Sequence, residues 1–266
     1  CYLTAPQIGQ EADKLLDMEL GELLDRYLEE MQRDNQLKVR LLPDNEGNAQ
    51  ACYYSKTLYY DEETVATRVR AMSGPMAVDE ARVAAWIDRN CRTAELALSP
   101  EQAAAVAGVV GHHFAILTGG PGCGKTTTTL VIVRLLEAMG REVLLAAPTG
   151  RAAQRMSEVI GREAKTLQGL LEWQRDRFKR NEEDPLRADF LIVDECSMLD
   201  ISLTASLLKA VPAGCQLLFI GDADQLPSVG AGNVLRDLIA AGCIPCYRLT
   251  RVFRQARESL IIRYAH

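Results

Sequence analysis

The sequence predicts an α/β protein with a parallel sheet and flanking helices, preceded by a small helical, winged-helix-like α+β region. From about residue 99, helical stretches alternate with short apolar runs, which is typical of strands buried on both faces. Before residue 99, one amphipathic helix leads into two alternating runs instead. With 266 residues, of which 48% are hydrophobic, the chain is long enough for two domains with substantial cores.

The first region, residues 1–94, is expected to form a helix and a hairpin. Residues 17–33 place apolar side chains on one face at helical spacing: Leu20, Leu23, Leu24, Tyr27, Leu28 and Met31. Strands are predicted at 36–42 and 49–60, around the turn "PDNEGN". This order resembles a winged-helix unit, but a packing domain without DNA contacts fits equally well. Helices at 61–74 and 79–96 lead into the next domain.

The second region, residues 95–266, is expected to hold the parallel sheet. Its strands are predicted at the apolar runs 114–118, 142–148, 189–195 and 216–222. Each run ends in polar or Gly-rich residues. Because ligands of such sheets bind beyond the carboxyl ends of the strands, the chemistry is expected there.

The stretch "GGPGCGKT" (119–126) follows the first of these strands and precedes a helix, which is the context of a phosphate-binding P-loop. Its backbone N–H groups and the helix N-terminus favour phosphate. Lys125 is expected to neutralise the β- and γ-phosphates, and the Thr126 hydroxyl to ligate Mg²⁺. The predicted nucleotide-binding residues of this segment are Gly120, Pro121, Gly122, Cys123, Gly124, Lys125, Thr126 and Thr127. The motif predicts a nucleoside triphosphate without saying what it is used for.

The run "LIVDE" (191–195) supplies two carboxylates at the end of a buried strand. Asp194 is the second predicted ligand of Mg²⁺, commonly through water. Glu195 is the predicted general base for the attacking water. The pair favours an ATPase over a guanine-nucleotide switch, because the base-reading pattern N-K-x-D does not occur in the sequence.

The composition predicts the cellular compartment of the protein and the region that binds an anionic partner. No apolar run approaches the roughly 20 residues of a membrane span, and the start lacks the pattern of a signal peptide. Eight scattered cysteines are typical of reduced thiols, and the lone Cys243-x-x-Cys246 has no second pair at zinc-site spacing. We therefore expect a bacterial-type cytoplasmic protein without membrane contact. Residues 1–98 carry 11 basic and 18 acidic groups, and residues 99–266 carry 19 and 18, so an anionic partner is expected on the second region.

Six ordered motifs between residues 98 and 266 resemble the RecD-like DNA helicases of superfamily 1. They are "LSPEQAAAV" (98–106), "LTGGPGCGKTTT" (117–128), "AAPTGRAA" (146–153), "FLIVDECSMLD" (190–200), "GDADQLPSVGAGNVL" (221–235) and "LTRVFRQARESLIIRYAH" (249–266). The resemblance implies a RecA-like P-loop NTPase domain that uses ATP and Mg²⁺ to move 5′ to 3′ on single-stranded DNA and to unwind duplex junctions. It also implies a monomer that works with other repair or recombination proteins.

The resemblance assigns four further residues to the nucleotide. Gln102 matches the glutamine that reads adenine, and Phe253 matches a position where an aromatic ring stacks on the base; a core aromatic is the alternative for Phe253. Arg254 matches the arginine that contacts the γ-phosphate, a group worth roughly 10³–10⁵ in rate. Gln225 matches the γ-phosphate sensor.

Gln225 lies in "GDADQLPSVGAG" (221–232), for which a metal site, a plain turn and a nucleotide sensor are all conceivable. Thr126 and Asp194 are already the predicted ligands of Mg²⁺, so a metal site is the least favoured of the three interpretations of this stretch. Asp222 is expected to orient the loop, and the glycines to let it turn.

The resemblance also assigns DNA contacts. The segment Pro148, Thr149, Gly150 and Arg151 is expected to bind a DNA phosphate through backbone N–H, hydroxyl and guanidinium. Thr166 is a further candidate, in a motif where Gln168 and Gly169 replace the usual His and Arg. An inserted hairpin at about 172–187 corresponds to a pin that parts the duplex, with Arg180 among its DNA-contacting cations; an exposed charged loop is the alternative.

The second RecA-like domain of such helicases has no motifs in this chain. We therefore expect these residues alone to bind ATP weakly, to hydrolyse it little and not to unwind DNA. Two other readings stay open: the helicase part of a conjugative relaxase, and a non-motor P-loop switch or loading factor.

Overall fold

The computed structural model describes residues 1–21, 23–44, 46–91 and 97–252. The chain divides into two compact units, Cys1–Val65 and Ala66–His266. This division lies earlier than the predicted domain boundary at 94/95, because Val83 of the connecting helices joins the core of the second unit. The functional boundary at 94/95 stays a prediction.

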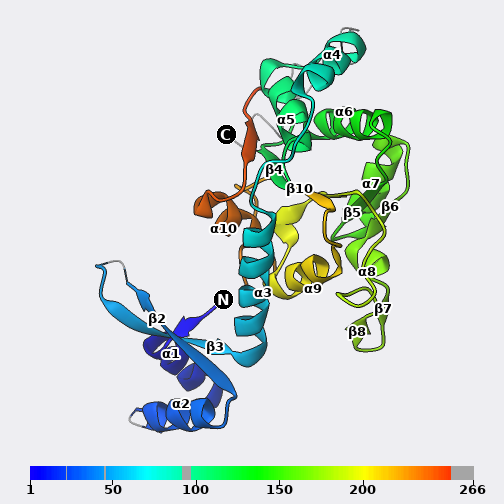
Figure 1. Cartoon of the computed structure of the whole chain (residues 1–266). Helices are drawn as coiled ribbons and strands as arrows, with labels where there is room; N and C mark the ends of the chain where they lie inside the picture. The colour runs from blue at the N-terminus through cyan, green and yellow to red at the C-terminus, as the bar shows by residue number, and fades with distance from the viewer. Residues whose placement is uncertain (22, 45, 92–96, 253–266) are drawn as a thin grey trace. The chain divides into compact units, whose positions relative to one another are not determined.

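The first unit is a three-stranded antiparallel sheet accompanied by two helices (Figure 1). The strand order is β1-β3-β2. The elements are β1 (Leu3–Thr4), α1 (Ala5–Leu16), α2 (Leu23–Arg33), β2 (Leu37–Pro43) and β3 (Ala49–Ser55), followed by α3 (Lys56–Met72), which continues into the second unit.

Two sequence predictions for this unit need correction. The strand predicted at 49–60 ends at Ser55, because the Ser55 hydroxyl accepts a hydrogen bond from the N–H of Leu58 (3.3 Å) and α3 begins at Lys56. The helix predicted at 17–33 begins only at Leu23, as α2; Asp17 adopts a left-handed conformation (φ +52°) that ends a separate preceding helix, α1.

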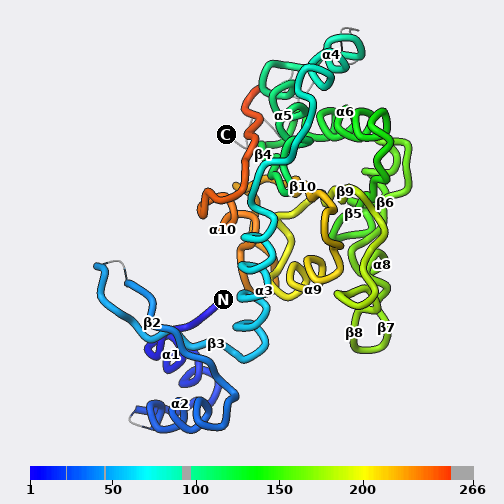
Figure 2. Tube along the Cα trace, in the orientation of Figure 1, coloured from blue at the N-terminus to red at the C-terminus, as the bar shows by residue number. Residues whose placement is uncertain are grey.

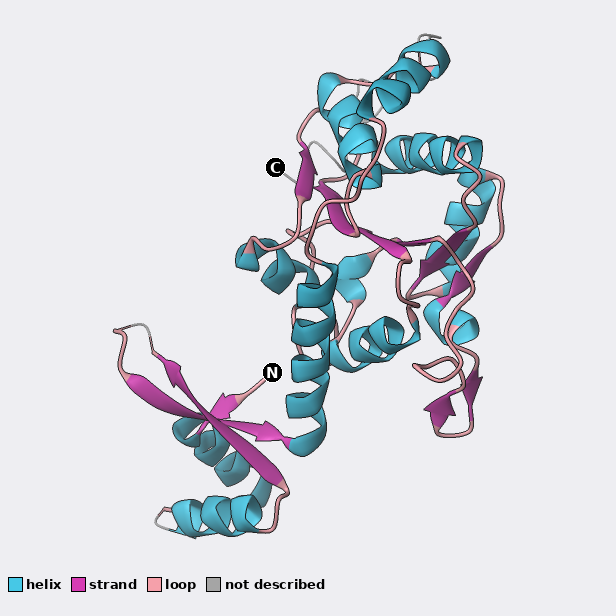
Figure 3. Cartoon of the chain, viewed as in Figure 1, coloured by secondary structure: helices cyan, strands magenta, loops and turns pink. Residues whose placement is uncertain are grey.

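The second unit is an α/β layer structure (Figure 3). Its helices are α4 (Glu80–Asn90), α5 (Pro100–Val110), α6 (Lys125–Ala138), α7 (Gly150–Ile160), α8 (Leu167–Leu170), the 3₁₀ helix η1 (Cys196–Met198), α9 (Ile201–Ala210) and α10 (Val234–Ala241). Its main strands are β4 (Phe114–Gly119), β5 (Val143–Ala147), β6 (Ala164–Thr166), β9 (Phe190–Val193), β10 (Gln216–Gly221) and β11 (Cys246–Leu249).

These six strands form one parallel sheet in the order β11-β4-β10-β9-β5-β6. Figure 2 lets the reader follow how β11, near the end of the described chain, comes to lie beside β4 from its middle. The four predicted strands occupy the four central positions, which confirms the predicted fold class. The edge strands β6 and β11 were not predicted, because their short and partly polar sequences lack the apolar run of a central strand.

The core lies on both faces of the sheet. One face contributes Ala115, Leu117 and Leu218 to a buried cluster with α5, α6 and α7. On alternate positions, Phe114 and Phe219 point away from that cluster and pack edge-to-face with ring centroids 4.9 Å apart. Strands β4, β9 and β10 are buried along their whole length, so their carboxyl ends are held rigidly.

Gly119 is a position in the sheet where a side chain would collide with the backbone of the neighbouring strand. A Cβ there would lie 2.6 Å from the backbone oxygen of Leu249, its partner in the β4–β11 ladder. We expect Gly119→Ala to lower the free energy of unfolding by about 1–3 kcal/mol, because a backbone atom must move. Urea denaturation of the purified chain measures the change. Gly120→Ala is the matched control, since no atom lies within 4 Å of its Cβ position; equal effects of the two substitutions would contradict the steric explanation.

Within the residues that the structure describes, no helix combines the length and apolar character needed to cross a membrane. The eight cysteines are free thiols. Burial raises the pKa of the Cys123 thiol inside the P-loop, and the pKa of Cys196, which is more deeply buried, lies well above its usual range.

Candidate functional site

The site begins with the loop between β4 and α6. Gly122 (φ +77°) and Gly124 (φ +82°) adopt backbone conformations that disfavour side chains, which lets the loop turn sharply into the N-terminus of a 14-residue helix. The Lys125 ammonium donates to the carbonyl oxygens of Gly119 (2.5 Å) and Gly120 (3.2 Å). The loop therefore offers backbone N–H groups, a helix terminus and a lysine to an anion.

A cavity of about 730 Å³ opens over this loop. It brings together predicted residues from four separate segments: Gln102, the P-loop residues 120–127, Asp194 with Glu195, and Gln225. These segments lie up to 123 positions apart in the numbering and meet because α5, β4, β9 and β10 place them at one end of the sheet. Their roles in binding and hydrolysis stay predictions.

Asp194 and Glu195 stand just beyond the end of β9. The N–H of Glu195 donates to Asp194 Oδ1 (2.8 Å), and Glu195 itself has a left-handed backbone (φ +55°) that redirects the chain into η1. Burial raises the pKa of Asp194, while the N–H of Glu195 and the positive charges of Lys125 and Arg155 oppose that rise. A divalent cation at this carboxylate would favour its ionised form further.

Gln225 reaches the same end of the sheet from the loop after β10. Its side-chain oxygen accepts a hydrogen bond from the hydroxyl of Ser197 (3.2 Å), three residues beyond Asp194. Buried Asp222 accepts from the N–H of Asp224 (3.1 Å), as a residue that orients this loop would. With its oxygen held by Ser197, the amide nitrogen of Gln225 remains the group that can donate to a phosphate.

Gln102 is only 2% exposed and does not face solvent. It closes a capping box at the start of α5, where its side-chain oxygen accepts from the N–H of Ser99 (2.9 Å), and its Nε2 donates to the carbonyl of Gly124 (3.3 Å). The side chain thus supports the P-loop. Reading of adenine by this amide stays a prediction and would require it to exchange these partners.

The segment that carries Phe253 and Arg254 lies outside the described residues. Its approach is described as far as Val252: Glu101 of α5 accepts hydrogen bonds from the N–H (2.9 Å) and the hydroxyl (2.5 Å) of Thr250. These bonds lower the pKa of Glu101. They fix the exit of β11 next to α5, the helix that carries Gln102.

The predicted DNA contacts other than Arg180 lie at or just beyond the carboxyl ends of two neighbouring strands, β5 and β6. Thr149 caps α7 by accepting from the N–H of Ala152 (3.3 Å), and Thr166 caps α8 by accepting from Gly169 (3.0 Å). Because β5 and β6 pair with Ala147 opposite Thr166, the two helix N-termini stand side by side. Two adjacent N-termini with hydroxyl caps suit successive phosphates of a backbone.

The insertion at 172–187 contains a small hairpin, β7 (Trp173–Gln174) paired with β8 (Arg177–Phe178). At the end of the hairpin away from its turn, the rings of Trp173 and Phe178 stack edge-to-face with centroids 4.7 Å apart, and Trp173 is 53% exposed. A solvent-exposed aromatic ring on a hairpin can stack on a base. The pin role of this hairpin stays a prediction.

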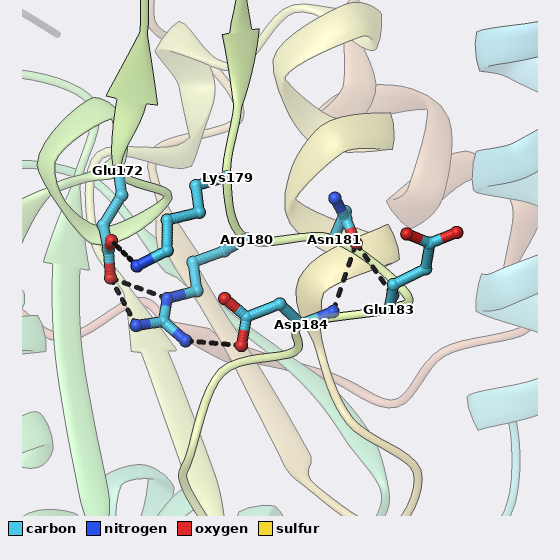
Figure 4. Close-up of polar contacts among 6 residues, drawn as sticks. All are labelled: Glu172, Lys179, Arg180, Asn181, Glu183 and Asp184. Carbon is cyan, nitrogen blue, oxygen red and sulfur yellow. Dashed lines mark hydrogen bonds and ion pairs between the residues drawn. The ribbon is translucent and has the colours of Figure 1, made fainter.

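Arg180 holds the base of the hairpin together (Figure 4). Its guanidinium is bonded to Glu172 Oε1 through Nε (2.7 Å) and Nη2 (2.5 Å) and to Asp184 Oδ1 through Nη1 (2.9 Å). The Lys179 ammonium also donates to Glu172 (2.8 Å), and these bonds lower the pKa of that carboxylate. The charge of Arg180 is therefore compensated within the hairpin, which favours an anchoring role over the predicted DNA contact.

Two residues at the site were missed in the sequence. Arg155 lines the cavity from α7, and Ser197 holds Gln225. The only available signals were the spacing of Arg155, one helical turn after Arg151, and the position of Ser197 three residues after Asp194. Neither signal identifies a nucleotide site without the tertiary contacts.

The parallel sheet, the phosphate loop after β4 and the carboxylate at the end of β9 define the fold of a P-loop NTPase. Residues 102–231 match the family model of an AAA domain. The chain is a homologue of the RecD-type DNA helicases.

Two curated relatives illustrate the relationship. The ATP-dependent RecD2 DNA helicase of Deinococcus radiodurans is 43% identical over 206 residues, which is 77% of this chain and 28% of the relative. The RecBCD enzyme subunit RecD of Mycobacterium tuberculosis is 38% identical over 57% of this chain and 28% of the relative. Among solved structures, Pif1 helicase from Candida albicans matches 60% of this chain and 41% of its own, with 26% identity and a TM-score of 0.46. The chain thus spans a little over a quarter of the curated relatives.

Proposed function

We propose that this chain carries the first RecA-like motor domain of an ATP-dependent DNA helicase, which couples ATP hydrolysis to 5′→3′ movement on single-stranded DNA. The observation that supports this most is the convergence of the P-loop, the strand-end carboxylates and Gln225 on one cavity. Participation in DNA repair or recombination, monomeric action and contacts with duplex junctions belong to the same proposal. Relatives named as ATP-dependent DNA helicases support it.

In this proposal each residue of the cavity has a separate role in ATP binding or hydrolysis. Lys125 leaves its two backbone carbonyls to neutralise the β- and γ-phosphates. Glu195 takes a proton from the attacking water, and Gln225 donates its amide N–H to the γ-phosphate end. Arg254 and Phe253 complete the site from the segment after β11.

A magnesium ion fits the residues present. Thr126, on the first turn of α6, and Asp194, beyond β9, line the same cavity and offer a hydroxyl and a carboxylate oxygen, the donor types that Mg²⁺ prefers. Among the described residues, no group of three or more His, Cys, Asp and Glu side chains could hold a metal alone. This donor set therefore suits an ion that arrives with a nucleotide, because the phosphates supply further ligands and the metal supplies charge neutralisation for phosphoryl transfer.

The proposed DNA path crosses the caps of α7 and α8. Thr149 and Thr166 are bonded within their own caps, but each hydroxyl hydrogen can still be donated to a phosphate oxygen. Exposed Arg151 adds a cation to the first of these N-termini. Nucleotide and DNA would thus be bound by loops at the same end of one rigid sheet, which is the arrangement that coupling requires.

Stimulation of hydrolysis by DNA tests the proposal. We expect single-stranded DNA to raise the steady-state rate of Mg·ATP hydrolysis by the full-length protein at least severalfold, because a motor hydrolyses ATP productively only on its track. Phosphate release with and without an unstructured oligonucleotide measures this. An unchanged rate in the presence of bound DNA would contradict the motor and favour a nucleotide switch or loading factor.

A further inference from the structure

Arg155 is a cation in the nucleotide cavity that the proposed mechanism does not yet use. It lies on α7, one turn beyond Arg151, and it lines the cavity together with Ala152 and Met156 of the same helix. This face of α7 is therefore directed at the P-loop. The neighbouring residue Gln154 is exposed and does not line the cavity, and its amide donates to Glu158 (2.9 Å).

The charge of Arg155 is not used in an ion pair within the described part of the chain. Three other arginines of this unit, by contrast, are paired: Arg162 with Glu137 (2.7 Å), Arg68 with Glu182 (2.6 Å) and Arg180 with Glu172. An arginine that lines a phosphate-binding cavity and keeps its five donors free is suited to bind phosphate oxygens bidentately.

The position of Arg155 along the cavity indicates which phosphates it meets. Arg155 lines the same cavity as Lys125 of the P-loop and Asp194 beyond β9. Asp194 is the proposed magnesium ligand, and Lys125 is the residue proposed to neutralise the β- and γ-phosphates. Gln102, the proposed adenine reader, belongs to a different element, α5. Arg155 therefore belongs to the triphosphate end of the cavity.

We infer that Arg155 is a nucleotide-contacting residue, which binds the β- and γ-phosphates from α7 opposite Lys125 on α6. This inference rests on the proposed nucleotide site. Because α7 starts with the proposed DNA contacts Thr149–Arg151, one helix would carry a DNA contact on its first turn and a triphosphate contact on its second.

Nucleotide affinity of the full-length protein tests the inference. We expect Arg155→Ala to weaken binding of fluorescent Mg·ATPγS by about 10-fold or more, the loss typical of a charge-assisted hydrogen bond, and to change binding of the matching ADP analogue much less. Arg155→Lys should recover part of the loss, because it keeps the charge without the bidentate fork. Gln154→Ala, at an exposed position on the same helix, should bind both nucleotides like the wild type.

Two comparisons separate the possible failures. Wild-type affinity for ATPγS in Arg155→Ala, in an assay where Lys125→Ala has lost binding, would overturn the role of Arg155 and leave the P-loop proposal standing. Undiminished binding in Lys125→Ala would overturn the nucleotide site itself, and the role of Arg155 with it. An equal loss for ATPγS and ADP would overturn the assignment to the triphosphate end. Thermal unfolding of each variant verifies that the exposed substitutions leave the fold intact.

Discussion

Replacing Lys125 by alanine is expected to lower ATP hydrolysis by the full-length protein by roughly 10²–10³-fold, the usual loss when one preorganised donor to a transition state is removed. In the structure the Lys125 ammonium already stands at the mouth of the P-loop, held by the carbonyls of Gly119 and Gly120. Its exchange of these carbonyls for phosphate oxygens needs no change of fold. Phosphate release under saturating ATP and single-stranded DNA measures the effect.

Binding of single-stranded DNA should survive Lys125→Ala almost unchanged, because the proposed DNA contacts lie on the caps of α7 and α8 rather than on α6. Fluorescence anisotropy of a labelled oligonucleotide measures this. Lys14→Ala, which removes an exposed lysine from α1 in the other unit, is the matched control and should leave both hydrolysis and DNA binding intact. Loss of DNA binding in parallel with hydrolysis would show that Lys125 supports the fold rather than the nucleotide.

Replacing Gln225 by alanine is expected to remove most of the stimulation of hydrolysis by DNA, with a rate on DNA lower by roughly 10²-fold, while ATP still binds. The physical reason is that Gln225 is proposed to contact the γ-phosphate and also lies close to the carboxylates at the end of β9. Its oxygen is bonded to Ser197, close in sequence to the proposed catalytic carboxylates Asp194 and Glu195, and its loop follows β10 directly. Without the amide, no side chain at this position can bond both to the γ-phosphate and to Ser197 near the end of β9.

Ser197→Ala is the matched comparison for Gln225→Ala. It removes the hydrogen bond to Gln225 Oε1 (3.2 Å) but leaves the amide nitrogen in place, so we expect a smaller loss of DNA stimulation. Nucleotide affinity and DNA-stimulated hydrolysis should be measured together on both variants. Weakened ATP affinity with a normal rate at saturation would contradict the role of Gln225 as a sensor and make it a simple binding residue.

The predictions from sequence were strongest where a function is encoded in consecutive residues. A P-loop needs glycines, a lysine and a hydroxyl in a fixed order, because the same short backbone segment wraps one phosphate group. A P-loop can therefore be recognised in residues 119–126 without any knowledge of the rest of the chain. The four central strands were predictable for a related reason: burial on both faces demands an uninterrupted apolar run.

Predictions were weaker where local sequence has more than one solution. The run 49–60 is rich in tyrosine and has the composition of a strand, yet a helix capped by Ser55 starts in its middle. Arg180 lies in a charged hairpin that predicts a DNA contact, yet its guanidinium forms ion pairs with Glu172 and Asp184. In both places the decision depends on hydrogen bonds whose geometry a residue pattern does not specify.

The sequence by itself therefore determined the class of fold, the phosphate loop and the strand-end carboxylates. Each of these features depends on neighbouring residues in a required order. Only the tertiary structure decided that Gln225 meets Ser197, that Thr149 stands beside Thr166 and that Arg155 lines the same cavity as the P-loop. These are relations between separate segments. They arise from the strand order of the sheet and from the side of each helix that packs against it, which the packing of the whole core selects.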